Sequence, residues 1–87
     1  MKIERFFVYI IQSKKDGSYY IGQCDDLDCR LSKHNDGFSK YSCSKRPWKL
    51  VYFELYASRS EAILREKQLK AKKSRKFLEY LISNKFQ

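Results

Sequence analysis

Two stretches of the sequence decide the fold: Arg-Phe-Phe-Val-Tyr-Ile-Ile-Gln at residues 5–12 and Ser-Tyr-Tyr-Ile-Gly-Gln at residues 18–23. Both are rich in β-branched and aromatic residues, which favour β-strands. The first stretch is apolar on both of its alternating faces, which predicts a central strand covered on both sides. Between them, Lys15-Asp16-Gly17 carries the Asp-Gly signal of a tight turn. The two stretches therefore predict a β-hairpin.

A helix is predicted directly after the hairpin. Asp25 and Asp26 offer an N-cap and favourable charge for its first turn. We expect this helix to run from about residue 26 to about residue 35, where Asp36-Gly37 ends it. The Ser- and Lys-rich residues 38–47 are expected to form a loop.

The second half of the chain predicts one more strand and two helices. Residues 48–56 form an apolar and aromatic strand pattern. Ser58-Arg59-Ser60-Glu61 is a capping box that opens a helix through about residue 72, and Ser74 can cap a last helix. The predicted order is β-β-α-β-α-α. This is an α+β fold in which helices flank a three-stranded sheet, and residues 1–87 make a single domain.

The charge is unevenly distributed along the chain. The net charge is +9, but residues 1–38 hold six basic and six acidic side chains, whereas residues 39–87 hold thirteen basic and four acidic ones. This asymmetry favours a polyanionic partner on one side of the molecule. The alternative is a solvated, lysine-rich surface that aids solubility.

No apolar run approaches the roughly 20 residues that a bilayer span needs, and the N-terminus does not have the pattern of a signal peptide. These features predict a cytoplasmic protein without membrane contact. Three cysteines, at positions 24, 29 and 43, are an odd number and favour reduced thiols. With His34 they could be written as a zinc site, but their spacing matches no usual ligand pattern. The alternative is three small, partly buried side chains.

One acidic residue falls inside an apolar helical stripe. At 100° per residue, Glu66 shares a face with Ala62, Ile63 and Leu69. A carboxylate in that position is costly unless it is paired, hydrogen-bonded or bound to a metal. The pattern leaves open a metal ligand or a half-exposed glutamate that meets a nearby basic or tyrosine side chain.

Four further polar residues are placed where chemistry could use them. Arg30 and His34 flank one edge of the first predicted helix, from which both can reach a common phosphate. The alternative is an arginine that covers the sheet edge and a histidine capped by a backbone carbonyl. Tyr9 and Tyr20 lie in adjacent strands, but the sequence does not determine the register that would put them on one face. Packing is their alternative role.

The residues quoted so far resemble the GIY-YIG nuclease superfamily, and more closely its small stand-alone bacterial members of the UPF0213 type. The resemblance covers Phe6 to about Ile82. Five segments carry it in order: Phe-Val-Tyr-Ile-Ile at 7–11, Tyr-Ile-Gly at 20–22, Asp-Leu-Asp-Cys-Arg-Leu-Ser-Lys-His-Asn-Asp-Gly at 26–37, Arg-Pro-Trp-Lys-Leu-Val-Tyr at 46–52 and Glu-Ala-Ile-Leu-Arg-Glu-Lys-Gln-Leu-Lys at 61–70.

The resemblance implies a catalytic set. Tyr9 is the tyrosine of the first motif, while Tyr20 and Gly22 belong to the second, in which the glycine is structural. Arg30 is the helix arginine expected to stabilise a pentacoordinate phosphate, and His34 lies four residues further on.

The resemblance also implies hydrolysis of phosphodiester bonds with one divalent cation, Mg²⁺ or Mn²⁺. Glu66 matches the single metal-binding glutamate, and a tyrosine together with water near the metal would generate the nucleophile. Arg65, Lys67 or Lys70 would add phosphate contacts. Cys24 and Cys29 depart from the family pattern, which usually has Thr or Ser and often Arg at these positions.

Substrate binding would then depend on the basic half of the chain. The candidate contacts are Lys40, Lys45, Arg46, Lys67, Lys70, Lys72, Lys73, Arg75 and Lys76. Three hypotheses follow. The first is a metal-dependent endonuclease that acts on DNA in repair or processing. The second is a nucleic-acid-binding module that cuts weakly or not at all, and the third is a domain whose basic face meets an acidic protein.

Overall fold

The predicted hairpin forms the first two strands of a three-stranded sheet. The computed structural model describes residues 5–37, 40–72 and 74–84. The strands are β1 (Phe6–Ser13), β2 (Tyr19–Cys24) and β3 (Trp48–Tyr56), in the order β2-β1-β3, with both pairings antiparallel. The central position of β1 confirms the prediction made from its two apolar faces.

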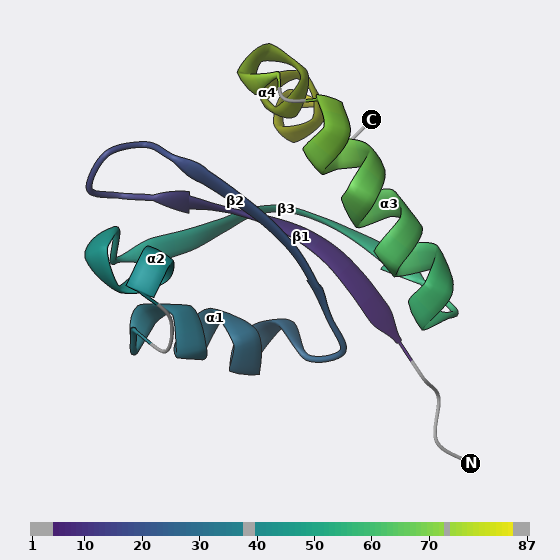
Figure 1. Ribbon diagram of the computed structural model, residues 1–87, viewed down its shortest axis with the longest axis horizontal. Coiled ribbons are helices and arrows are strands. Elements are labelled where there is room, and N and C mark those ends of the chain that lie inside the picture. The colour runs from purple at the N-terminus through teal and green to yellow at the C-terminus, as the bar shows by residue number, and fades with distance from the viewer. Residues whose placement is uncertain (1–4, 38–39, 73, 85–87) are drawn as a thin grey trace.

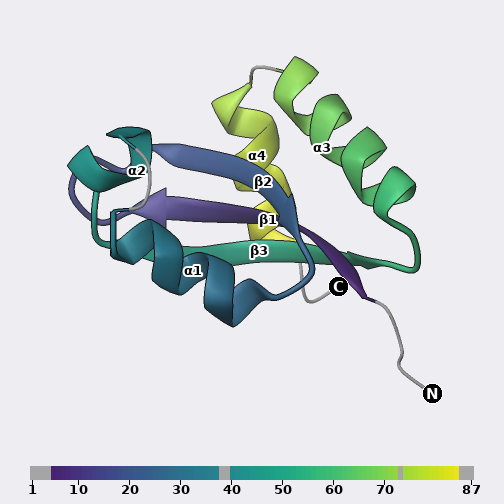
Figure 2. The ribbon, with the colours of Figure 1, turned by 60° about the horizontal axis from the view of Figure 1, so that its bottom comes forward.

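Helices cover both faces of this sheet (Figures 1 and 2). The helices α1 (Leu27–Asn35) and α2 (Lys40–Ser44) lie on one face, and α3 (Arg59–Lys72) and α4 (Arg75–Ser83) lie on the other. The predicted α+β fold and the order β-β-α-β-α-α are confirmed. Within the described ranges, no helix has both the length and the apolar composition of a membrane span.

The structure differs from the prediction at the segment 38–47, which contains the short helix α2 instead of being a loop throughout. A tertiary contact holds this turn, because the indole Nε1 of Trp48 donates to the carbonyl oxygen of Ser42 at 2.9 Å. Short helices are marginal without such packing. The local sequence, rich in Ser and Lys, therefore does not predict it.

The predicted helix caps are confirmed. Asp26 accepts a hydrogen bond from the Cys29 N–H at 3.0 Å, and Ser74 accepts one from the Phe77 N–H at 3.2 Å. Ser58 accepts one from the N–H of Glu61 at 3.3 Å, as a capping box requires. Side chains close to each helix start thus satisfy backbone donors that the helix itself leaves unpaired.

The two faces of β1 separate the core into two clusters. Phe6 and Val8 pack with Ala62 and Leu69 of α3 on one side. On the other side, the cluster that contains Tyr9 faces α1. Successive side chains of a strand point to opposite faces, so side chains of β1 that face α1 cannot also face α3.

A polar network ties α3 to the outer strand β3. The guanidinium of Arg65 donates to both carboxylate oxygens of Glu54, at 2.9 and 3.0 Å. The hydroxyl of Tyr56 donates to the same carboxylate at 2.6 Å, and Tyr52 donates to its other oxygen. These bonds hold the pKa of Glu54 below its ordinary value against the opposing effect of burial, which is the largest single influence on it. The carboxylate therefore stays charged and clamps the helix to the sheet.

We expect Arg65→Met to lower the free energy of unfolding by about 2 kcal/mol, because it leaves a partly buried carboxylate without its charged partner. Urea denaturation at neutral pH measures this loss. Glu79→Gln is the matched control, since it breaks the exposed Arg75–Glu79 pair, and should cost less than about 0.5 kcal/mol. Equal losses in the two variants would contradict a clamping role for Glu54 and Arg65.

Candidate active site

The strand register brings Tyr9 and Tyr20 onto one face of the sheet. Tyr9 lies opposite Gly22 and Tyr20 lies opposite Ile11, so side chains of both tyrosines point toward α1. Their rings are stacked with centroids 6.4 Å apart and planes at 28°. The convergence that the sequence left open is therefore present in the structure.

Gly22 has a steric reason to be glycine. A Cβ atom at this position would lie 2.5 Å from the hydroxyl oxygen of Tyr9 and 2.6 Å from its Cζ atom. The phenol of Tyr9 lies across the space that any other side chain would fill. Gly22 thus allows the Tyr9 ring to extend along the sheet toward α1.

His34 joins the two tyrosines from α1. Its side chain is buried, with 1% exposed, and its Nε2 atom is hydrogen-bonded to the Tyr9 hydroxyl at 3.0 Å. Its ring centroid lies 4.8 Å from that of Tyr20 in an edge-to-face arrangement. The Nε2 atom thus contacts the Tyr9 phenol, and not a backbone carbonyl as in the alternative considered for this histidine.

Trp48 completes this group of rings. Its centroid lies 6.3 Å from that of Tyr20 and 6.2 Å from that of His34. The side chain of Asn35 fixes its backbone, accepting from the Trp48 N–H at 2.6 Å and donating to the Trp48 carbonyl at 3.2 Å. Trp48 is the first residue of the predicted strand 48–56, and its side chain is buried with 3% exposed. Tyr9, Tyr20, His34 and Trp48 are called the aromatic cluster below.

Burial determines the protonation of Tyr9 and His34. It raises the pKa of Tyr9 well above the ordinary value for a phenol, with a further contribution from Tyr20, while the charge of Arg30 opposes the rise. Burial also lowers the pKa of His34, and Arg30 lowers it further. Near neutral pH, the Tyr9 phenol and the His34 imidazole are therefore both uncharged. The half-buried Arg30 supplies the positive charge that acts on both.

Glu66 is placed differently. It lies on α3, across the sheet from the helix that carries Arg30 and His34 (Figure 2). Its side chain is 20% exposed, and its Oε2 atom is paired with the Nζ atom of Lys70 at 2.8 Å. Lys70 is thus a basic partner of the kind that one of the two readings of the pattern expected. No interaction found among the described residues joins Glu66 directly to the aromatic cluster or to Arg30.

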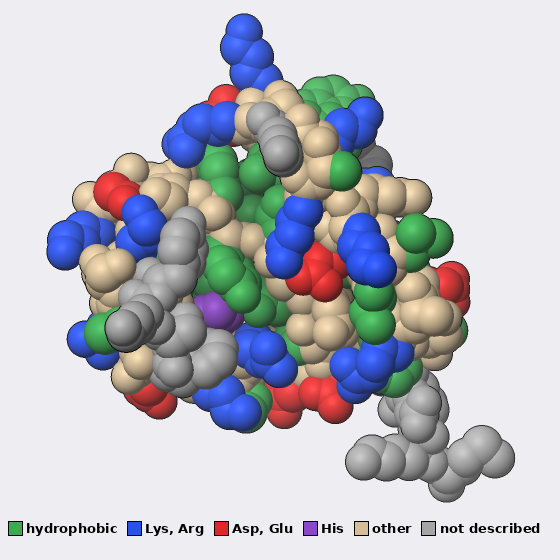
Figure 3. Space-filling model, viewed as in Figure 1, with side chains coloured by type: hydrophobic (Ala, Val, Ile, Leu, Met, Phe, Trp, Pro, Cys, Tyr) green, Lys and Arg blue, Asp and Glu red, His purple; other side chains and the backbone are tan. Residues whose placement is uncertain are grey.

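The two sides meet at the edge strand β2. A hollow of about 360 Å³ is lined by Tyr20 of the aromatic cluster and by Lys70, the partner of Glu66, among other residues. Figure 3 shows hydrophobic side chains at the bottom of this hollowed face and basic side chains around it. Tyr20 and Lys70 thus border a common surface, although the aromatic cluster and α3 lie on opposite sides of the sheet.

The cysteines do not form a metal centre in the described part of the chain. Cys24 is buried, Cys29 and Cys43 are exposed, and all three are free. No group of three or more His, Cys, Asp or Glu side chains able to hold a metal ion occurs among the described residues. The prediction of reduced thiols agrees with this arrangement, but the expectation that all three are partly buried is wrong.

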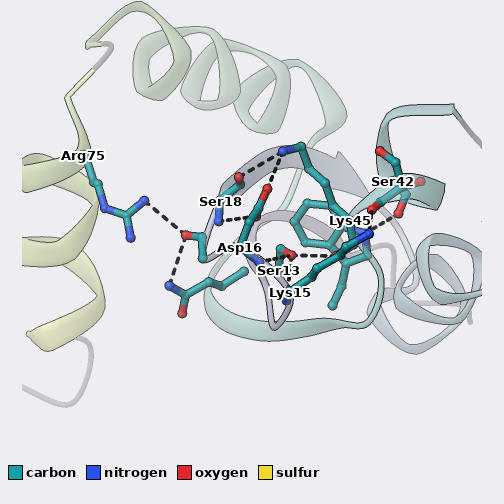
Figure 4. Close-up of polar contacts among 11 residues, drawn as sticks. Ser13, Lys15, Asp16, Ser18, Ser42, Lys45 and Arg75 are labelled. Carbon is teal, nitrogen blue, oxygen red and sulfur yellow. Dashed lines mark hydrogen bonds and ion pairs between the residues drawn. The ribbon is translucent and has the colours of Figure 1, made fainter.

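Several basic residues near the hairpin already have local partners (Figure 4). Lys45 pairs with Asp16 at 2.6 Å and donates to the hydroxyl of Ser18 at 3.2 Å. Arg46 donates to the carbonyl oxygen of Cys43 at 3.1 Å. The Lys45 contacts hold the hairpin turn against the segment before β3, and the Arg46 contact lies within that segment. Both residues therefore serve the fold in addition to any phosphate contact. The Lys40 side chain and Lys73 lie outside the described residues.

The basic residues of α3 and α4 are more accessible. Lys67, Lys70 and Lys72 on α3, and Arg75 and Lys76 on α4, are all exposed. Arg65 is an exception on α3, because its Nε and Nη2 atoms donate to Glu54. The phosphate contact that the resemblance implies for Arg65 would compete with this clamp.

Comparisons with known proteins agree with this architecture. The family model described as the GIY-YIG catalytic domain matches residues 5–79. UPF0213 proteins of Staphylococcus epidermidis and Staphylococcus saprophyticus are 44% and 41% identical over 69 residues, covering 78% of this chain and 83% of theirs. The solution NMR structure of a UPF0213 protein from Bacillus halodurans is 38% identical, with a TM-score of 0.57, over 91% of this chain and 83% of that one.

We expect NMR titration of His34, the only histidine of the chain, to give a pKa below the ordinary value of about 6.5. Arg30→Gln should raise this pKa, because it removes a nearby positive charge that disfavours the imidazolium. Burial remains in that variant, so the pKa should still stay below the ordinary value.

Lys33→Gln is the matched control for this titration, since Lys33 is exposed on the same helix and its removal should shift the pKa less. A His34 that titrates at or above its ordinary value, or equal shifts in the two variants, would contradict the described arrangement of Arg30 and His34.

Proposed function

This chain belongs to the GIY-YIG family of nucleases and is a small protein of the UPF0213 type, and from this premise we propose that it is a metal-dependent endonuclease. It hydrolyses phosphodiester bonds in DNA, in repair or processing, and acts in the cytoplasm. Family membership implies a nucleic acid as the substrate. The choice of DNA, the metal dependence and the cellular role are part of the proposal.

The observation that carries the proposal is the convergence of Tyr9, Tyr20, His34 and Arg30 at one end of the sheet's α1 face. Residues from two strands and one helix meet there, and the shared hydrogen bond and ring contacts hold them in place. Packing alone does not require a buried imidazole next to two phenols. A neutral histidine hydrogen-bonded to a phenol is a common device for moving a proton at neutral pH.

The two tyrosines have different access to a substrate. Tyr9 is 2% exposed, so it has almost no surface to offer to a phosphodiester. Tyr20 is half-buried and lines the hollow beside β2. In the proposed reaction, Tyr20 orients the attacking water, while Tyr9 and His34 hold the ring in place. The hydrogen bond between the Tyr9 hydroxyl and the neutral imidazole of His34 fixes the orientation of both rings behind Tyr20.

Arg30 has the complementary role of stabilising negative charge. Its guanidinium is half-buried and acts electrostatically on Tyr9 and His34, so it lies close to the aromatic cluster. A guanidinium suits the equatorial oxygens of a pentacoordinate phosphate, because it can donate two parallel hydrogen bonds to them.

Glu66 is the residue that would hold the divalent cation. It is a partly exposed carboxylate on α3, and Mg²⁺ in nucleases commonly uses one or two carboxylates and completes its shell with water and substrate phosphate. The residue type and exposure fit such an ion, although Lys70 occupies one carboxylate oxygen. When bound, the cation would polarise the scissile phosphate and stabilise the leaving oxygen.

The same lysine supports the alternative function, a nucleic-acid-binding module. The ammonium of Lys70 neutralises Glu66 in the structure. If Lys70 stays paired with Glu66 and no metal ion binds there, the protein would bind nucleic acid and cut it weakly or not at all. This second candidate keeps the basic surfaces of α3 and α4 but assigns no reaction to the aromatic cluster.

We expect the purified protein to cut DNA when Mg²⁺ or Mn²⁺ is added to a panel of single-stranded, duplex and branched substrates. Glu66→Gln should lower the rate of cutting by at least about 100-fold, because Glu66 is the carboxylate proposed to hold the ion. Glu79→Gln is the matched control, since Glu79 is also a glutamate in an i,i+4 pair with a basic residue, and it should change the rate less than about twofold.

Salt-sensitive DNA binding without metal-dependent cutting would favour the binding module over the nuclease. Absence of binding to any nucleic acid would instead leave the acidic-protein partner as the remaining hypothesis.

We also expect Lys70→Gln to tighten Mn²⁺ binding, measured by paramagnetic broadening of amide signals near residue 66. The variant removes both a competing cation and a nearby positive charge, and an exposed ion pair of this kind corresponds to a change of about two- to fivefold. Lys67→Gln removes the same charge from an exposed residue next to Glu66 and should have a smaller effect. Equal changes in the two variants would argue that Lys70 does not compete with the ion.

A further inference from the structure

The hollow beside β2 has walls suited to an unpaired nucleobase. It has a volume of about 360 Å³, which is at the lower end of the volumes that hold small organic ligands. Three elements line it: β2 through Tyr19, Tyr20 and Ile21, α3 through Leu69 and Lys70, and α4 with its cap through Ser74, Arg75 and Leu78. Most of these side chains are apolar or aromatic.

Two cations stand at the rim of the hollow. The side chains of Lys70 and Arg75 are 53% and 56% exposed. The Arg75 guanidinium lies 4.6 Å from the centre of the Tyr19 ring and donates to the carbonyl oxygen of Gly17 at 3.1 Å (Figure 4). Each cation is therefore held in place by a local contact while most of it remains open to solvent.

The acidic partners of these cations do not prevent a phosphate from binding. Lys70 pairs with Glu66 at 2.8 Å, and Arg75 pairs with Glu79 at 3.2 Å. Both cations are more than half exposed, and surface pairs between neighbouring turns of one helix contribute on the order of 1 kcal/mol or less each. A phosphate that offers charged oxygens to both cations can therefore replace the acidic partners. The chain carries a net charge of +9, which further favours a polyanion.

The walls of the hollow favour an unpaired base over a paired one. In a duplex, the ring faces of each base are covered by its neighbours, so only its edges are open to protein. A hollow with apolar and aromatic walls contacts ring faces, which are available only when a base is unpaired and unstacked. A rim of cations around such walls is the arrangement expected for a single strand, with the base inside and its phosphates at the border.

From this combination we propose that the hollow formed by β2, α3 and α4 is a subsite for one unpaired nucleotide of single-stranded DNA. This inference rests on the proposed function for the identity of the ligand. Because Tyr20 belongs both to the hollow and to the aromatic cluster, a nucleotide held there lies next to the phosphodiester bond to be cut. The substrate class is then single-stranded DNA or an unpaired segment of a larger DNA.

The test measures DNA binding in the presence of EDTA, so that neither metal nor cutting contributes. Fluorescence anisotropy with a labelled short oligodeoxynucleotide should show tighter binding of the single strand than of its own duplex at the same salt concentration. Arg75→Gln and Tyr19→Leu should each weaken single-strand binding by about five- to tenfold, as expected for the loss of a stacking or phosphate contact.

Lys49→Gln is the matched control. Lys49 is exposed on the outer strand β3 and carries the same charge, but it is not a candidate contact and does not line the hollow. Its loss should weaken binding less than about twofold if the effect of Arg75 comes from the subsite and not from net charge. Since Arg75 also contacts the hairpin turn, amide shifts of the unaltered protein give a second measurement: the single strand should perturb Tyr19, Ile21, Leu69 and Ser74.

Duplex binding that equals single-strand binding, variants at Arg75 and Tyr19 that behave like Lys49→Gln, or shift changes confined to other surfaces would each overturn the subsite. These outcomes are separate from those of the nuclease test. The expected binding pattern without metal-dependent cutting would support the subsite and refute the proposed nuclease activity. Metal-dependent cutting with none of the expected binding differences would support the nuclease activity and refute the subsite.

Discussion

The antiparallel register that sets Tyr9 opposite Gly22 is the constraint on which the rest of the site depends. A Cβ atom at position 22 would lie 2.5 Å from the Tyr9 hydroxyl, so only a glycine there lets the phenol extend toward His34. The hydrogen bond between Tyr9 and His34 then connects the sheet to α1. A shift of the register by one residue would turn every side chain of β2 to the other face. Tyr20 would then no longer contact the other residues of the aromatic cluster.

The central strand also explains why the candidate machinery is divided. Both faces of β1 are covered, with the aromatic cluster beneath α1 and a cluster of Phe6, Val8, Ala62 and Leu69 beneath α3. Glu66 lies on α3, across the sheet from α1. The two halves can act on one substrate at the β2 edge, where no further strand intervenes and where Tyr20 and Lys70 border the same hollow. The substrate itself would thus bridge the two sides.

The basic side chains discussed above fall into two groups. Near the hairpin, Lys45 neutralises Asp16, and on α3 the clamp with Glu54 takes up Arg65. These cations hold elements of the fold together. Along α3 and α4, by contrast, Lys70 and Arg75 are more than half exposed, and their acidic partners lie within the same helices. Contacts of the second kind are easily exchanged, which is what a surface for a polyanion requires.

The sequence by itself determined the strands, the main helices, their caps and the central place of β1. Each of these follows from local signals: side-chain alternation, helical spacing, and the capping residues Asp26, Ser58 and Ser74. It also pointed to the residues of the aromatic cluster other than Trp48, through the resemblance to a nuclease family. The tertiary structure decided what depends on contacts between distant segments. These are the register that unites Tyr9 and Tyr20, the helix before Trp48, the commitment of Lys45 and Arg65 to the fold, and the pairing of Glu66 with Lys70. The physical reason is that spacing along a chain sets which face a side chain occupies, whereas only packing across the sheet sets which partner it meets there.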